Sequence, residues 1–362
     1  MKKLILFLWL LNVTSEAADG FHIYAPSPTT KRLLVVKAEE TDGGLSLKLA
    51  QKFDLGFPAA AIAVHPQYPT LYFAASRFQG ENSTLGYAQL GNDELVRRHG
   101  RIRTEHGYAY LSLDPQRKFL LGVDYRSGAV DVRRINDRMN GVPRAQVVGS
   151  LDEGRPTAHC VLVSPENRSV YISYVKDNNA LYQYRFDPEK GTFTALEPKN
   201  VGPPAGTGPR HQAYHPRLPI TYFSNEQHLG VSVYEMAKSG HLKLRQVCDA
   251  VDKDVPKDGV SSSDIVITPD GKYVFAGIRG HKRDCDWVSR YQVKKNGELE
   301  LLGLTNADKI PWGFALSPDG RYLLVTAFQG ATLTAYKIEA GGGLRVAGKL
   351  DWDPKISDLV IR

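Results

Sequence analysis

Four ionisable side chains occupy two fixed positions relative to a recurring proline, either six residues before it or ten residues after it. They are His159, Arg210, Glu226 and Arg279. Two arginines can hold a carboxylate or phosphate group through paired hydrogen bonds. A histidine or a glutamate beside them can remove a proton from a bound molecule. These residue types therefore point to a site that binds an anionic ligand next to an acid or base.

Arg210 and Glu226 flank the same proline, Pro216, at similar distances from the turn that follows it. We interpret this segment as two short strands joined by that turn. The two side chains would then be cross-strand neighbours at the open end of the hairpin. Charges near a channel are costly to desolvate unless they pair with each other or bind a ligand. A salt bridge in a merely polar rim is therefore the structural alternative to a ligand site.

The recurring proline belongs to a unit that repeats along most of the chain. Each unit has an apolar strand, the proline, a polar turn and a second apolar strand, followed by two more strand-like segments. Consecutive prolines are 49 to 53 residues apart. They are Pro66, Pro115, Pro165, Pro216, Pro269 and Pro318. Four short strands per period of this length are typical of a β-propeller blade.

The six complete units leave the two ends of the chain to form a seventh. Residues 356–362 resemble a first strand, and residues 21–24, 32–36 and 45–49 resemble the second, third and fourth strands. Joining them in one blade would close the ring and remove its open sheet edges. We therefore predict an all-β fold over residues 19–362. It is a seven-bladed β-propeller whose last blade is closed by the C-terminal strand together with the N-terminal strands.

The propeller geometry brings the chosen positions to one face. The first strand of each blade lines the central channel, so its start lies on the same face as the end of the second strand. The four ionisable residues come from three consecutive blades and would meet there as catalytic groups. Three further residues lie in these positions or one residue away and are expected to bind substrate: His211, Asp264 and Trp312.

The first 18 residues predict a secretory signal peptide. A basic start, Met1 to Lys3, precedes an apolar run from Leu4 to Val13, and small residues around Ala17 suit cleavage. The apolar run is too short to span a membrane, and no later segment is apolar enough. We expect a periplasmic or secreted protein with no membrane contact after cleavage.

The composition narrows the choice of partners. The chain has 46 basic and 39 acidic residues, a net charge of +7, and no arginine-rich run of the kind that binds nucleic acid. Spaced zinc-ligand motifs, nucleotide-binding glycine loops and Gly-x-Ser-x-Gly are also missing from the sequence. We expect a monomer without metal or cofactor that binds a small molecule.

Several other residues receive structural interpretations. Cys160 lies in an apolar strand and is expected to be buried, whereas Cys248 and Cys285 could pair in an oxidising compartment. The basic run at residues 97–103 is expected to be a solvated loop. Histidines that precede the turn prolines, such as His215, are expected to cap these turns.

The sequence around the candidate site resembles a known family. Gly208 to His211, Ser224 to Glu226, and the segments 263–275 and 311–323 are similar to the seven-bladed lactonase family. Its members include propeller-type bacterial 6-phosphogluconolactonases and, more distantly, fungal carboxy-muconate lactonizing enzymes.

The resemblance implies a hydrolase that opens a sugar-derived or otherwise anionic lactone. It also implies a site of one histidine, two arginines and one glutamate, which match His159, Arg210, Arg279 and Glu226. Either His159 or Glu226 would then be the general base. A muconate-type cycloisomerase and an exported propeller that only binds a partner remain alternative hypotheses.

Overall fold

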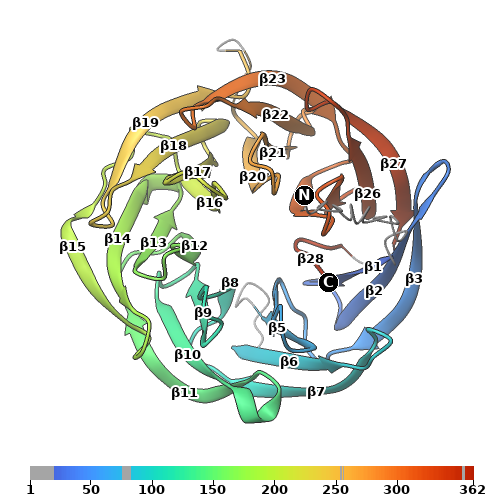
Figure 1. The fold of residues 1–362 in the computed structure, drawn as a ribbon, viewed down its shortest axis with the longest axis horizontal. Coiled ribbons are helices and arrows are strands. Elements are labelled where there is room, and N and C mark those ends of the chain that lie inside the picture. Colours follow the sequence, from blue (N-terminus) through green and yellow to red (C-terminus); the bar gives the residue numbers. More distant parts are fainter. Residues whose placement is uncertain (1–19, 76–82, 253–254, 256, 353–354) are drawn as a thin grey trace, which may run out of the picture.

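The protein is a ring of seven four-stranded antiparallel sheets (Figure 1). The seven-bladed β-propeller that the sequence predicts is thereby confirmed. The predicted signal peptide lies outside the part of the chain that is described. The computed structural model describes residues 20–75, 83–252, 255, 257–352 and 355–362.

Two strands of each blade lie closest to the ring axis. The innermost strands are β28 (Val360–Ile361), β4 (Ala61–Val64), β8 (Tyr108–Leu113), β12 (Ala158–Val163), β16 (Pro209–Tyr214), β20 (Val260–Ile267) and β24 (Pro311–Leu316). The second strands are β1 (Phe21–Pro26), β5 (Thr70–Ala74), β9 (Phe119–Asp124), β13 (Ser169–Tyr174), β17 (Ile220–Asn225), β21 (Tyr273–Gly280) and β25 (Tyr322–Ala327).

The other two strands complete each blade toward the periphery. The third strands are β2 (Arg32–Thr41), β6 (Thr84–Leu90), β10 (Val130–Asn136), β14 (Ala180–Asp187), β18 (Gly230–Met236), β22 (Trp287–Val293) and β26 (Thr332–Ile338). The outermost strands are β3 (Gly44–Asp54), β7 (Val96–Arg103), β11 (Val142–Leu151), β15 (Thr192–Asn200), β19 (Leu242–Asp249), β23 (Leu299–Asn306) and β27 (Leu344–Asp351). Within the described residues, the short 3-10 helix η2 (Asp137–Met139) follows β10, and the short 3-10 helix η3 (Lys176–Asn178) follows β13.

Burial falls from the second strand of a blade to the outermost one. Every residue of β9, β13, β17 and β25 is buried, because both faces of these strands pack against neighbouring blades. The outermost strand β7 exposes most of its residues. It contains the basic run 97–103, so the prediction of a loop there is wrong. An outermost strand has one free edge and tolerates charged side chains, which conceal its strand pattern.

The two ends of the chain close the ring. Strand β28 pairs with β1, so that Ile361 lies opposite Ile23 and Val360 opposite Tyr24. The backbone of His22 also exchanges hydrogen bonds of 2.7 and 2.9 Å with that of Arg362. The predicted blade of C-terminal and N-terminal strands is therefore confirmed.

The histidines before the turn prolines cap these turns, as predicted. Nδ1 of His215 accepts hydrogen bonds from the backbone N–H groups of Arg217 at 3.0 Å and Leu218 at 2.9 Å. His65 makes the same pair of contacts in its own turn.

A β-bulge interrupts the innermost strand of five blades near its start. In the blade formed by β12 to β15, the residue left out of the ladder is His159, between two paired neighbours. In the blade formed by β16 to β19, the bulge holds Arg210 and His211. Because a bulge re-aims the side chains of the strand that carries it, it can direct one side chain across the ring and its neighbour elsewhere.

Candidate functional site

A cavity of about 390 Å³ lies where the innermost strands begin and the second strands end. All four predicted catalytic residues line it, and so does Trp312. The lining residues are Pro28, Ala60, Ala109, Tyr125, His159, Lys176, Arg210, Glu226, Ser261, Arg279, His281, Trp312, Phe328 and Ser357. The positions six before and ten after the recurring proline therefore mark one side of a real cavity.

Glu226 ties the two arginines together. Its Oε2 lies 3.0 Å from Nε of Arg210 and 3.8 Å from Nη2 of Arg279. The predicted side-chain contact between Arg210 and Glu226 across the hairpin is thus confirmed. Arg279 also donates a hydrogen bond of 2.6 Å from Nη2 to the carbonyl oxygen of Ser262.

The arginines keep unused hydrogen-bond donors. Arg210 and Arg279 are only 1% and 4% exposed. Within the described part of the chain, Nη1 of Arg210 and Nε of Arg279 are buried and have no hydrogen-bond partner. Buried polar groups are normally paired, so unpaired guanidinium donors beside a cavity indicate a missing acceptor.

The cavity has an excess of positive charge. Lys176, Arg210 and Arg279 face a single carboxylate, that of Glu226. Burial and, to a smaller extent, the charge of Arg210 lower the pKa of Arg279 to about 9, against the opposing effect of Glu226. Two guanidinium groups held this close favour an anion between or above them.

His159 lines the cavity as a neutral imidazole. Burial lowers its pKa well below the usual value, and the positive charge of Arg210 acts in the same direction. Its ring packs edge-on against Tyr125 at 5.5 Å and against His211 at 4.9 Å between ring centres. Its Nδ1 is buried and without a hydrogen-bond partner among the described residues. A neutral imidazole can accept a proton at the pH of the cell.

Trp312 forms an aromatic wall beside Arg279. The guanidinium carbon of Arg279 lies 4.5 Å from the centre of the Trp312 ring. The ring of Phe328 packs against the ring of Trp312, with 5.0 Å between the two ring centres. A cation over an aromatic face is attracted to it, so this wall holds the guanidinium in place.

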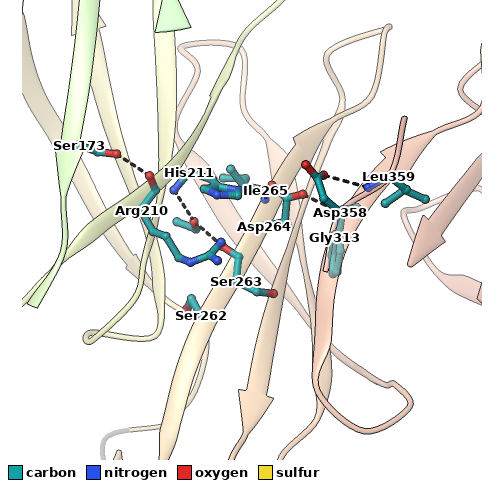
Figure 2. Close-up of polar contacts among 12 residues, drawn as sticks. Ser173, Arg210, His211, Ser262, Ser263, Asp264, Ile265, Gly313, Asp358 and Leu359 are labelled. Carbon is teal, nitrogen blue, oxygen red and sulfur yellow. Dashed lines mark hydrogen bonds and ion pairs between the residues drawn. The ribbon is translucent and has the colours of Figure 1, made fainter. Parts of the chain in front are cut away.

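His211 and Asp264 do not line this cavity. Nδ1 of His211 instead lies 2.7 Å from Oδ1 of Asp264 (Figure 2). Asp264 instead lines a second cavity together with Asp358 and Tyr110. The structure therefore separates these two residues from the arginines, although they are next to them in sequence or register.

The cavity residues that the sequence analysis did not single out include two with basic side chains, Lys176 and His281. Lys176 begins the 3-10 helix η3, one residue beyond the position ten after Pro165, and His281 lies two residues beyond the position ten after Pro269. His281 lines the cavity from the segment that follows β21. Its Nε2 lies 2.9 Å from Oγ of Ser261.

The three cysteines are free thiols. Cys160 is 1% exposed, as predicted, and burial raises the pKa of its thiol to about 12. The described residues contain no group of three His, Cys, Asp or Glu side chains arranged to hold a metal ion. Over the same residues, the structure has no helix of the length and hydrophobicity needed to cross a membrane.

Together the fold and the cavity define a seven-bladed propeller with a cationic site on one face of its channel. The sequence profile described as "Lactonase, 7-bladed beta-propeller" matches residues 22–349. The chain therefore belongs to the seven-bladed β-propeller lactonase family, a family of lactone-hydrolysing enzymes.

Relatives and solved structures of similar shape agree with this assignment. The chain is 28% identical to a 6-phosphogluconolactonase of Klebsiella pneumoniae (strain 342) over 326 residues, which cover 89% of this chain and 92% of that protein. It is 27% identical to that of Cronobacter sakazakii over 325 residues, with the same two coverages. The structure of Pseudomonas aeruginosa periplasmic gluconolactonase, PpgL, aligns with a TM-score of 0.82 at 19% identity, covering 94% of this chain and 99% of that one.

Proposed function

We propose that this enzyme hydrolyses a small anionic lactone derived from a sugar, with His159 as the general base. The observation that carries the proposal is the neutral imidazole of His159 in the same cavity as two arginines with free donors. The family and the names of the relatives, 6-phosphogluconolactonase and gluconolactonase, support a sugar lactone as the substrate.

The reaction needs a water molecule, a base and a place for developing negative charge. His159 takes a proton from water as the water oxygen bonds to the lactone carbonyl carbon. The carbonyl oxygen becomes an oxyanion, which Arg210 and Arg279 stabilise by charge and hydrogen bonds. The ring C–O bond then breaks, and the proton passes from His159 to the departing alkoxide oxygen. The product is the open-chain hydroxy acid.

Glu226 is assigned a positioning function. Its carboxylate lies between the two guanidinium groups and contacts both of them. It neutralises part of the charge of two adjacent arginines and so allows them to stay side by side. Lys176, at the edge of the cavity, is placed to attract the anionic group of the substrate.

The sequence pattern of the first 18 residues supports export of the enzyme. The substrate would then be a lactone present in the periplasm or outside the cell. We further propose that the enzyme acts as a monomer, because its site is formed within one ring.

The test is hydrolysis of 6-phosphogluconolactone, gluconolactone and a muconolactone by the chain without residues 1–18. His159→Gln and Glu226→Gln serve as the two informative variants. These lactones open spontaneously, so only a rate above the uncatalysed background counts. We expect His159→Gln to lower kcat by about 100-fold or more and Glu226→Gln to lower it less.

Two results would contradict the proposal. A folded wild-type chain that accelerates none of the lactones would exclude the activity. A larger loss in Glu226→Gln than in His159→Gln would exclude His159 as the base and assign that function to Glu226.

A further inference from the structure

A largely buried polar pair lies next to the cavity residue His159. His211, on β16, and Asp264, on β20, come from adjacent blades and meet there (Figure 2). Their side chains are 12% and 15% exposed, and Nδ1 of His211 lies 2.7 Å from Oδ1 of Asp264. Neither residue lines the cavity, so any effect on the reaction must pass through another group.

The protonation of this pair follows from its contacts. Asp264 accepts backbone N–H groups of Ile265 at 2.8 Å and Phe314 at 2.9 Å in addition to His211. Burial acts to raise the pKa of Asp264, but His211 and these N–H groups hold the pKa below its usual value. An ionised carboxylate only accepts hydrogen bonds. His211 must therefore carry a proton on Nδ1 and donate it to Asp264.

That arrangement leaves Nε2 of His211 as an acceptor. Burial, together with the charge of Arg210, lowers the pKa of His211, so the ring is neutral and Nε2 has no proton. Within the described residues, Nε2 of His211 is buried without a hydrogen-bond partner, and so is Nδ1 of His159. The two rings are in edge-on contact, with 4.9 Å between their centres. No hydrogen bond joins these two nitrogens in the structure, so pairing them requires a rotation of at least one of the two touching rings.

We propose that Asp264 and His211 are positioning residues that orient His159 through a chain of hydrogen bonds across the channel. In the active state the ring of His159 rotates so that its Nδ1 proton is donated to Nε2 of His211, while His211 donates its own Nδ1 proton to Asp264. This pairing fixes the tautomer of His159 with a bare Nε2, the nitrogen left to accept the proton of water. The inference rests on the proposed function of His159 as the base.

The charges around His159 explain why such a chain is needed. When His159 takes a proton, it becomes an imidazolium ion beside Arg210 and Arg279, and both arginines oppose that charge. The groups that face His211 and His159 are these two arginines, Asp264 and the phenol rings of Tyr110 and Tyr125. The carboxylate of Asp264 is the member of this set that favours a positive charge, and His211 connects it to His159.

The sequence offers a matched control. Asp358 stands in Ser-Asp-Leu-Val-Ile, as Asp264 stands in Ser-Asp-Ile-Val-Ile. It likewise accepts two backbone N–H groups, from Ile62 at 3.0 Å and Leu359 at 2.9 Å. No hydrogen bond or ion pair between Asp358 and a histidine occurs in the described part of the chain. Asp358→Asn therefore reproduces the loss of backbone contacts without breaking the chain to His159.

The experiment compares Asp264→Asn, Asp358→Asn and His211→Phe with the full chain at several pH values. We expect Asp264→Asn and His211→Phe to lower kcat about 10- to 100-fold, with KM changed less than about threefold. Asp358→Asn should keep kcat within about twofold of wild type. Asp264→Asn and His211→Phe should lower kcat even on the plateau of the pH profile. The reason is that these changes alter the tautomer of His159 as well as its pKa.

Nitrogen-15 NMR of the histidine rings supplies a measurement that does not need a substrate. In wild type, His159 and His211 should both show protonated Nδ1 and unprotonated Nε2, and Asp264→Asn should change this pattern. Signals would be assigned with His159→Gln and His211→Phe. Protonated Nε2 in wild-type His159, or equal kcat values for Asp264→Asn and Asp358→Asn, would overturn the inference. If these tautomers are found but no lactone is hydrolysed, the chain of hydrogen bonds stands and the proposed function fails.

Discussion

The guanidinium carbon of Arg279 lies 4.5 Å above the ring of Trp312. The indole thus covers one face of a cation whose Nη2 is already bound to the carbonyl oxygen of Ser262. The same Nη2 lies 3.8 Å from Oε2 of Glu226, so three neighbours hold this guanidinium beside the cavity, and its Nε keeps an unused donor. Preorganised donors of this kind bind an anion without the cost of ordering a flexible side chain.

Replacement of Trp312 tests this arrangement. Trp312→Leu should lower kcat/KM about tenfold, because a desolvated cation–aromatic contact contributes about 1–2 kcal/mol. Trp312→Phe keeps an aromatic face and should lose less than about threefold. The matched control is Phe328→Leu, which removes the ring behind Trp312 but not the one beneath Arg279. Equal losses in Trp312→Leu and Phe328→Leu would argue for simple packing instead.

The rate of hydrolysis should be constant through neutral pH and should fall at alkaline pH. Burial and Arg210 keep the pKa of His159 well below its usual value, so the base is unprotonated and kcat/KM is at its plateau through neutral pH. On the alkaline side kcat/KM should fall as pH rises through about 9, the pKa to which burial and Arg210 lower Arg279, because the anion then loses a cationic partner. Initial rates between pH 5 and about 10.5, corrected for hydroxide-catalysed opening, would show this. A plateau that continues past about pH 10 would contradict the assignment of Arg279.

The repeat in the sequence was sufficient to predict the ring, its closure and the level of the site. A proline recurring at a nearly constant interval places His159, Arg210, Glu226 and Arg279 at the same height in their blades. The repeat does not predict which way each of these side chains points, because a bulge interrupts the innermost strand at that position. His211 follows Arg210 by one residue but enters the channel instead of the cavity.

The sequence analysis missed the cavity residue Lys176 and the outermost strand β7 for other reasons. Lys176 reaches the cavity from a left-handed backbone conformation, with φ of 55°, at the start of the 3-10 helix η3 between β13 and β14. Short connections of this kind have no strand alternation, so nothing in the sequence gives their direction. Strand β7 was missed because its exposed residues are mostly charged, which removes the apolar pattern that identifies strands.

The closing strand should be essential to the stability of the ring. Deletion of residues 356–362 removes β28 and two buried apolar side chains, Ile356 at 0% and Leu359 at 3% exposure. Burial of such residues contributes about 1.5–3 kcal/mol each, so the free energy of unfolding should fall by about 3–6 kcal/mol. The newly unpaired edge of β1 should also favour association.

Urea unfolding and gel filtration of the deletion would measure both effects. Arg362→Ala is the control, because it keeps the strand and removes only the contacts of one side chain with Glu94 and Tyr68. A monomeric deletion variant as stable as Arg362→Ala would show that the ring does not depend on β28.

The carboxyl group of Asp358 should make the stability of the protein depend on pH. Burial and, to a smaller extent, the charge of Asp264 raise the pKa of Asp358 to about 8. In the unfolded chain an aspartate titrates near pH 4. The folded state therefore binds one more proton between these values, and the stabilisation is complete below about pH 4 and lost as pH rises to about 8.

In Asp358→Asn the group cannot ionise. Relative to this variant, wild type should lose on the order of 1–3 kcal/mol between pH 4.5 and 8, after allowance for its partial exposure. Urea unfolding of both proteins at pH 4.5, 6 and 8 measures this difference, and parallel stability curves would mean that Asp358 is ionised in the folded protein throughout.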